Sequence, residues 1–135
     1  MLFKFLAKYR DFGLLVMRLG LGVMFLLHGL PKLTGGPQKW KSLGAAMGNL
    51  GIDFYFIVWG FLAAVTEGIG GLLLILGVFY RPTCTLLCFV MIVATAKHLH
   101  ANDPFVGVAS YPLELAFVFF GLAFVGPGRF SIDKD

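Results

Sequence analysis

The segment Phe54–Tyr80, FYFIVWGFLAAVTEGIGGLLLILGVFY, decides the fold, and Glu67 is its one charged residue. The hydrocarbon core of a bilayer is about 30 Å thick and a helix rises about 1.5 Å per residue, so about 20 apolar residues cross it. An ionisable group at that depth costs about 2.5–3.5 kcal/mol and normally faces the bundle interior, where it finds a partner. Glu67 is therefore a candidate functional residue. Ala63 and Gly71, one helical turn away on either side, are expected to leave space around its carboxylate.

The composition of the chain indicates a membrane protein. Of its 135 residues, 59% are hydrophobic and 13% are charged, and the mean hydropathy is +0.87. A soluble domain this short cannot bury so much apolar surface, so we predict one membrane domain over residues 1–135 that is solvated by lipid. The isoelectric point near 9.3 suggests nucleic-acid binding, but the basic residues stand at the ends of apolar runs, where they meet lipid headgroups. We therefore predict no nucleic-acid partner.

Four apolar runs predict an all-α, integral membrane four-helix bundle: Phe12–Leu30, Phe54–Tyr80, Thr83–His98 and Tyr111–Val125. Pro31 to Gly36 has the composition of a loop. Trp40 to Leu50 carries apolar residues at helical spacing, which predicts a short interfacial helix or a re-entrant half-helix. Gly60, Ala64 and Gly68 form a ridge of small residues that would let another helix approach closely.

The distribution of Lys and Arg predicts the orientation. With four spans, one side holds both termini and the basic residues Lys4, Lys8, Arg10, Arg81, Arg129 and Lys134. The other side holds Lys32, Lys39, Lys41 and Lys97. This excess favours both termini in the cytoplasm. The first run has basic residues before it and no small-residue cleavage site, so we read it as an uncleaved anchor.

One polar cluster is expected near the middle of the membrane. Helix rise places Glu67 and Glu114 at one level, roughly 17 Å from the termini side, with Arg18 about 9 Å in. Arg18 would keep one carboxylate ionised, and the second would then stay protonated. The cluster would be either a site that handles protons or orients a ligand, or a structural group that locks helix packing.

A second cluster is expected near the other membrane boundary: His28, Lys32, Lys97, His98 and His100. Histidines at one level could bind a metal or haem, or exchange protons with a quinone. Alternatively, they could be interfacial residues whose ring nitrogens are only hydrated. Cys84, Cys88, Met91, Thr95 and His98 share a helix face but extend over more than about 20 Å. That distance is too long for one ion, so we predict core packing there and no metal site.

The chain resembles the DoxX family of small bacterial membrane proteins. The matching segments are RLGLG (Arg18–Gly22), HGLPK (His28–Lys32), EGIGGLLLILG (Glu67–Gly77), Arg81–Pro82, YPLE (Tyr111–Glu114) and GPGRFSID (Gly126–Asp133). The resemblance implies a four-helix membrane bundle in the bacterial plasma (inner) membrane. Relatives include a subunit of a thiosulfate:quinone oxidoreductase, members of membrane complexes linked to superoxide dismutase, and related assembly chaperones.

The residues and the resemblance together predict a membrane component of a redox system that binds a quinone or a similar apolar ligand. Glu67 and Glu114 would manage protons, Arg18 would set their charge, and His28, His98 and Lys32 would contact the ligand. The chain would act as a subunit of a quinone-linked oxidoreductase, as a homo-oligomer or with a redox partner subunit. The alternative is a non-catalytic membrane subunit or assembly factor whose buried charges are structural.

Overall fold

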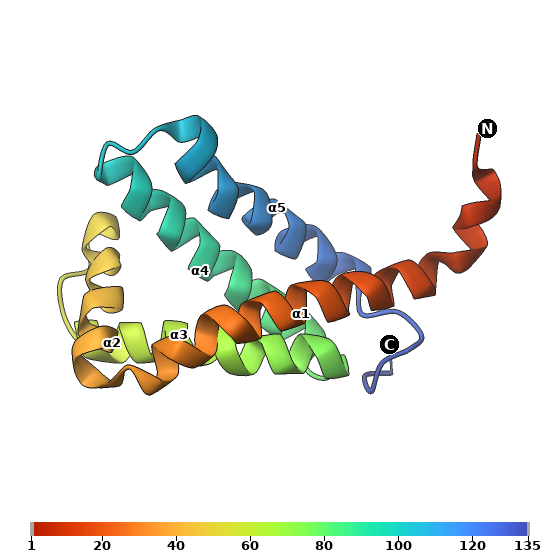
Figure 1. Ribbon diagram of the computed structural model, residues 1–135, viewed down its shortest axis with the longest axis horizontal. Helices are drawn as coiled ribbons and strands as arrows, with labels where there is room; N and C mark the ends of the chain where they lie inside the picture. Colours follow the sequence, from red (N-terminus) through yellow and green to blue (C-terminus); the bar gives the residue numbers. More distant parts are fainter. Residues whose placement is uncertain (1, 135) are drawn as a thin grey trace.

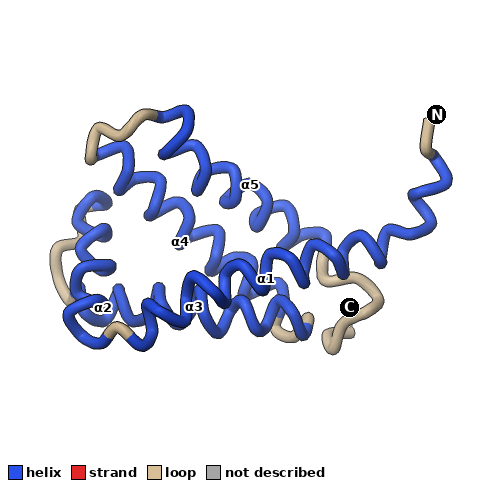
Figure 2. The backbone as a smooth tube through the Cα atoms, in the orientation of Figure 1, coloured by secondary structure: helices blue, strands red, loops and turns tan. Residues whose placement is uncertain are grey.

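The computed structural model describes residues 2–134, and helices account for most of them (Figure 2). The helices follow in the order η1 (Lys4–Tyr9), α1 (Arg10–Thr34), α2 (Gly36–Gly44), η2 (Ala45–Leu50), α3 (Phe56–Leu76), α4 (Tyr80–His100), η3 (Phe105–Ala109) and α5 (Ser110–Val125). Within the described chain, four stretches are long and apolar enough to cross a membrane: Lys4–Thr34, Phe56–Leu76, Tyr80–His100 and Phe105–Val125. The predicted all-α four-span fold, with a short helix between the first and second spans, is confirmed.

The spanning helices form two antiparallel pairs, α1 with α3 and α4 with α5 (Figure 1). The pairs converge near the two chain termini and separate toward the other end. The segment α2–η2 runs across that other end, where α2 packs on α3 and η2 packs on α4. We call this the α2 end and the opposite one the termini end.

The hydrophobic core lies where the two pairs converge. The rings of Phe25 in α1 and Phe119 in α5 meet edge to face, with centroids 5.2 Å apart. Other fully or nearly fully buried members of this core are Leu74, Tyr80, Cys84, Leu87, Met91, Ala116 and Leu122. Of the stripe predicted to pack in the core, Cys84 and Met91 are buried in it, Thr95 is also buried, and Cys88 is partly buried against it. His98, the last member of the stripe, lies outside this core and lines the cavity described below.

Small residues let α3 meet two other helices at backbone distance, as the predicted ridge requires. A Cβ on Gly29 of α1 would collide with the backbone of Gly68, and a Cβ on Gly22 would lie 2.6 Å from the carbonyl oxygen of Gly71. A Cβ on Gly60 would collide with the backbone of Trp40 in α2. The ridge of small residues on α3 therefore packs against α1 at Gly68 and against α2 at Gly60.

The first span differs from its prediction at its end. Pro31 was expected to begin a loop, yet α1 continues through it to Thr34. The proline removes one backbone donor near the helix end, and its ring is exposed, where it displaces no neighbour. The Thr34 hydroxyl donates to the Leu30 carbonyl over 3.0 Å, and the turn falls after it, where Gly36 has a φ of +83°.

The glycine contact between α1 and α3 predicts a specific loss of stability. Gly29→Ala should destabilise the fold by about 1–3 kcal/mol, because its methyl group would overpack a backbone contact. Gly20→Ala, in the same helix with nothing within 4 Å of the added carbon, is the matched control. Both changes raise helix propensity by a similar amount, so the difference in unfolding free energy in detergent isolates the contact. Equal stabilities would contradict the packing described here.

Candidate functional site

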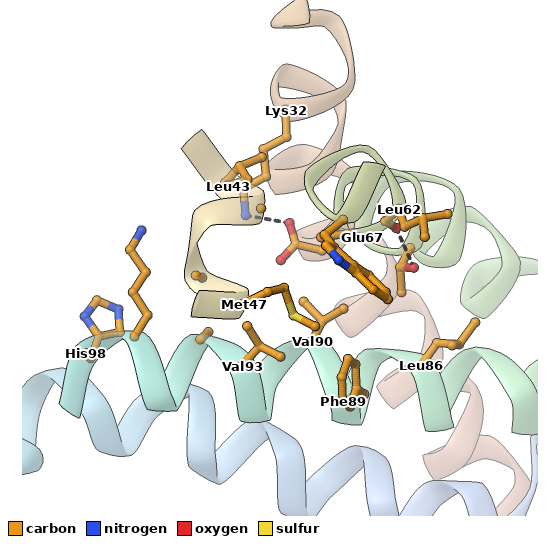
Figure 3. Close-up of a pocket in the computed structure, with 17 residues that line it drawn as sticks. Lys32, Leu43, Met47, Leu62, Glu67, Leu86, Phe89, Val90, Val93 and His98 are labelled. Atoms are coloured by element: carbon orange, nitrogen blue, oxygen red, sulfur yellow. Dashed lines mark hydrogen bonds and ion pairs between the residues drawn. The ribbon is translucent and has the colours of Figure 1, made fainter. Parts of the chain in front are cut away.

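A cavity of about 340 Å³ lies between α3 and α4 toward the α2 end, with α2 and η2 forming a further wall (Figure 3). Most of its lining is apolar: Leu43, Met47, Leu62, Leu86, Phe89, Val90 and Val93. Its polar lining groups include Lys32, Trp59, Thr66, Glu67, Lys97 and His98. Apolar cavities of about 300–1,000 Å³ that carry a few polar groups are typical small-molecule sites.

An ion pair forms part of the cavity wall. The Lys32 ammonium lies 2.5 Å from Oε2 of Glu67, and Glu67 is 5% exposed. The pair follows from the helix packing, because Gly29 and Gly68 bring α1 against α3 directly beside these two residues. The indole nitrogen of Trp40 donates to the Lys32 carbonyl over 3.0 Å and ties the end of α1 to α2.

The expected space around Glu67 is present on one side only. Ala63 lines the cavity. Gly71 faces α1, where a Cβ would lie 2.6 Å from the Gly22 carbonyl oxygen. The carboxylate therefore borders the cavity on the side of Ala63 and packed backbone on the side of Gly71.

His98 lies on the α4 wall of the same cavity and is oriented by Asp103. Nδ1 of His98 is 2.7 Å from Oδ2 of Asp103, and the Asp103 backbone N–H donates to the His98 carbonyl over 3.1 Å. An ionised carboxylate only accepts hydrogen bonds, so Nδ1 is the donor in this contact, and in a neutral ring Nε2 would be the acceptor. Asp103 was not identified as a site residue from the sequence. A carboxylate five residues after a histidine, just past a helix end, was the available signal.

Arg18 does not join Glu67, so the predicted cluster of Arg18, Glu67 and Glu114 is wrong. Nη1 of Arg18 donates to the carbonyls of Leu74 (3.4 Å) and Ile75 (3.3 Å), and Nη2 donates to the Phe130 carbonyl. The last carbonyls of a helix have no partner within it, and the guanidinium caps those of α3. They lie two helical turns beyond Glu67, about 10 Å along the axis.

The C-terminal segment Gly126–Asp133, here called the tail clasp, completes this arrangement at the termini end. The Asp133 carboxylate accepts from the backbone N–H groups of Phe79 (3.1 Å) and Tyr80 (2.9 Å), at the start of α4. The Arg129 backbone N–H donates to Oδ1 of Asp11 over 3.1 Å. The tail clasp, one of the segments that carry the family resemblance, therefore joins α1 and the α3–α4 turn.

The remaining predicted site residues lie outside the cavity. Glu114 is exposed on α5, which pairs with α4 and does not face α3. His28 is also exposed, and its Nδ1 lies 2.7 Å from the Met24 carbonyl of the same helix. Within residues 2–134, no three His, Cys, Asp or Glu side chains are grouped closely enough to share a metal ion. The expected convergence of the three histidines is therefore wrong. Of the predicted cluster, Lys32, Lys97 and His98 line the cavity, whereas His28 and His100 do not.

The contact of Glu67 with Lys32, and its separation from Arg18, predict different coupling energies for the two pairs. Glu67→Gln combined with Lys32→Met should couple by about 0.5–3 kcal/mol in unfolding free energy, because the two groups are in contact. Glu67→Gln combined with Arg18→Met should be additive within about 0.5 kcal/mol, because the residues are separated and share no partner. Two double-mutant cycles in the same detergent measure both values. A strong coupling between Arg18 and Glu67 would contradict their separation in the structure and support the predicted cluster.

Comparison with known proteins identifies the family of the chain. The profile of the DoxX family matches residues 13–100. The inner membrane protein YphA of Escherichia coli is 31% identical over 94% of this chain and 96% of its own length. The inner membrane protein YqjF of the same organism is 29% identical over 96% and 95%, and an uncharacterized protein of Haemophilus influenzae is 29% identical over 96% and 94%. No solved structure gives a significant match. With its four apolar helices, this chain is a membrane protein that belongs to the DoxX family.

Proposed function

We propose that this protein is a membrane component of a redox system and binds a quinone-class ligand in the cavity between α3 and α4. The observation that carries the proposal is the Lys32–Glu67 pair in the wall of an otherwise mostly apolar cavity within a membrane bundle. A quinone has an apolar ring and tail with two carbonyl oxygens that accept hydrogen bonds. The lining offers apolar walls for the ring and tail, and the ammonium groups of Lys32 and Lys97 can donate to the carbonyl oxygens.

The polar residues of the cavity also suit proton exchange. Oxidation of a bound quinol to the quinone releases two electrons, which a partner redox subunit would accept, and two protons, which the cavity residues would accept. Glu67 is a nearly buried carboxylate whose charge is balanced by Lys32. His98, with Nδ1 held by Asp103, offers Nε2 as the second proton-accepting atom. Arg18, Glu114 and His28 have no part in this proposal, because they lie outside the cavity.

Quinone binding can be followed through Trp59, which lines the cavity. In nanodiscs, a short-chain quinone should quench the tryptophan fluorescence of the wild-type protein with a saturable curve. Glu67→Gln should weaken binding by about 10- to 100-fold, because it removes the charged partner of the donating Lys32. The matched control is Glu114→Gln, the same substitution in an exposed residue outside the cavity, and it should change affinity less than about twofold. Non-saturable quenching of the wild type, or equal effects of the two variants, would contradict the proposal.

The alternative function is a non-catalytic subunit or assembly factor. Its specific support is Arg18, a charge buried at 1% exposure whose described hydrogen bonds go to backbone carbonyls, as a structural charge requires. Native mass spectrometry from mild detergent separates the two functions. A retained quinone-sized mass favours the redox component, whereas a second copy or a foreign subunit on a ligand-free chain favours the assembly role.

A further inference from the structure

A second hollow, of about 520 Å³, lies at the termini end of the bundle, far along the helices from the cavity described above. The beginning of α1, the beginning of α4 and the tail clasp with its following residue form its walls. Its charged lining residues are Arg10, Asp11, Arg81, Arg129, Asp133 and Lys134. Basic groups therefore outnumber acidic ones among the described lining residues.

The two acidic residues of the hollow are engaged by the backbone. Asp133 caps the N–H groups of Phe79 and Tyr80, and Asp11 accepts from the backbone N–H of Arg129. These carboxylates therefore hold the tail clasp together and are compensated by peptide dipoles. The net charge of the described lining residues is positive, because the basic side chains among them are more numerous.

Two of the basic side chains that line the hollow are held by contacts with their neighbours, and two are exposed. Nη1 of Arg81 donates to the carbonyls of Ala123 and Phe124 over 2.8 Å each, at the end of α5. The Arg129 guanidinium lies over the Phe130 ring, 4.9 Å from its centroid. Arg10 and Lys134 are exposed. Guanidinium groups bind phosphate oxygens well because they present several donors in one plane.

The hollow lies at the level where lipid headgroups are expected. Arg10 is the first residue of α1, Arg81 is the second of α4, and α5 ends at Val125. The neighbouring Phe124 is 71% exposed, so an acyl chain can lie against it. Next to the hollow, the segment Lys4–Tyr9 turns away from the axis of α1 with its aromatic and basic side chains exposed, as an interfacial segment does (Figure 1).

We propose that this hollow binds the phosphate group of an anionic phospholipid, with the acyl chains lying along the exposed end of α5. The site is independent of the quinone proposal, because it uses none of the residues of the α3–α4 cavity. Basic pockets between helices at a membrane boundary bind such headgroups in general, with each Lys or Arg contributing to the attraction.

The test uses delipidated full-length protein and native mass spectrometry, with phosphatidylglycerol and phosphatidylcholine of identical chains as probes. The wild type should retain phosphatidylglycerol at least tenfold more tightly. Arg10→Gln with Arg129→Gln should abolish most of that preference while leaving the clasp intact, because Arg129 serves the clasp through its backbone. Lys39→Gln with Lys41→Gln removes the same charge from exposed positions on α2 and should leave the preference unchanged.

Two further measurements on the wild type test the proposal even if the Arg10/Arg129 variant folds poorly. In the wild type, 1 M NaCl should reduce the preference strongly, because the Debye length then falls to about 3 Å. Millimolar inorganic phosphate should not displace the lipid, and displacement would show a soluble-oxyanion site and overturn the lipid assignment. Equal retention of the two lipids, or a preference unchanged in the Arg10/Arg129 variant, would also overturn it.

Discussion

The backbone contact between α1 and α3 is the constraint on which the rest of the structure depends. Lipid tails are as apolar as leucine, so membrane helices associate through close packing and polar contacts rather than through burial from water. Gly29 on Gly68 and Gly22 on Gly71 provide that packing. The same contact fixes the register that places Lys32 beside Glu67 at one end and Arg18 beside the last carbonyls of α3 at the other. A shift of one helical turn would separate both sets of partners.

The polar groups of the bundle divide into those that satisfy the backbone and those that border a cavity. Arg18 caps the end of α3, Arg81 caps the end of α5, and Asp133 caps the start of α4. In a membrane, unpaired backbone groups at helix ends cost several kcal/mol each, so these charges have a sufficient structural role. Glu67 differs because its partner is another side chain and its neighbours include empty space. Burial of a charge alone does not separate these two classes, whereas the identity of its partner does.

The sequence predicted the fold better than the site, and the reason is physical. Span length and the small-residue ridge depend on local properties, so the four helices and the tight packing of α3 could be predicted. Depth along a helix could also be predicted, but the facing direction could not, which is why Arg18 and Glu114 were wrongly grouped with Glu67. Lys32 and His98 were assigned to one ligand site, and the structure brings both to the cavity that Glu67 also lines. The role of Asp103 depends on how the chain turns after α4, which no periodicity encodes.

The two helix pairs are joined differently at the two ends of the bundle, and this difference bears on the cavity. At the termini end, the core and the tail clasp join the two helix pairs through buried rings and backbone hydrogen bonds. At the α2 end, α2 is held to α3 at backbone distance through Gly44 and Gly60. Its connection to the other pair is η2 against α4, with Met47 buried beside the cavity. The two helix pairs are therefore joined at this end by η2 and by the contacts between α3 and α4, beside an open cavity rather than a filled core. A ligand between α3 and α4 would supply the packing layer that the side chains leave open there.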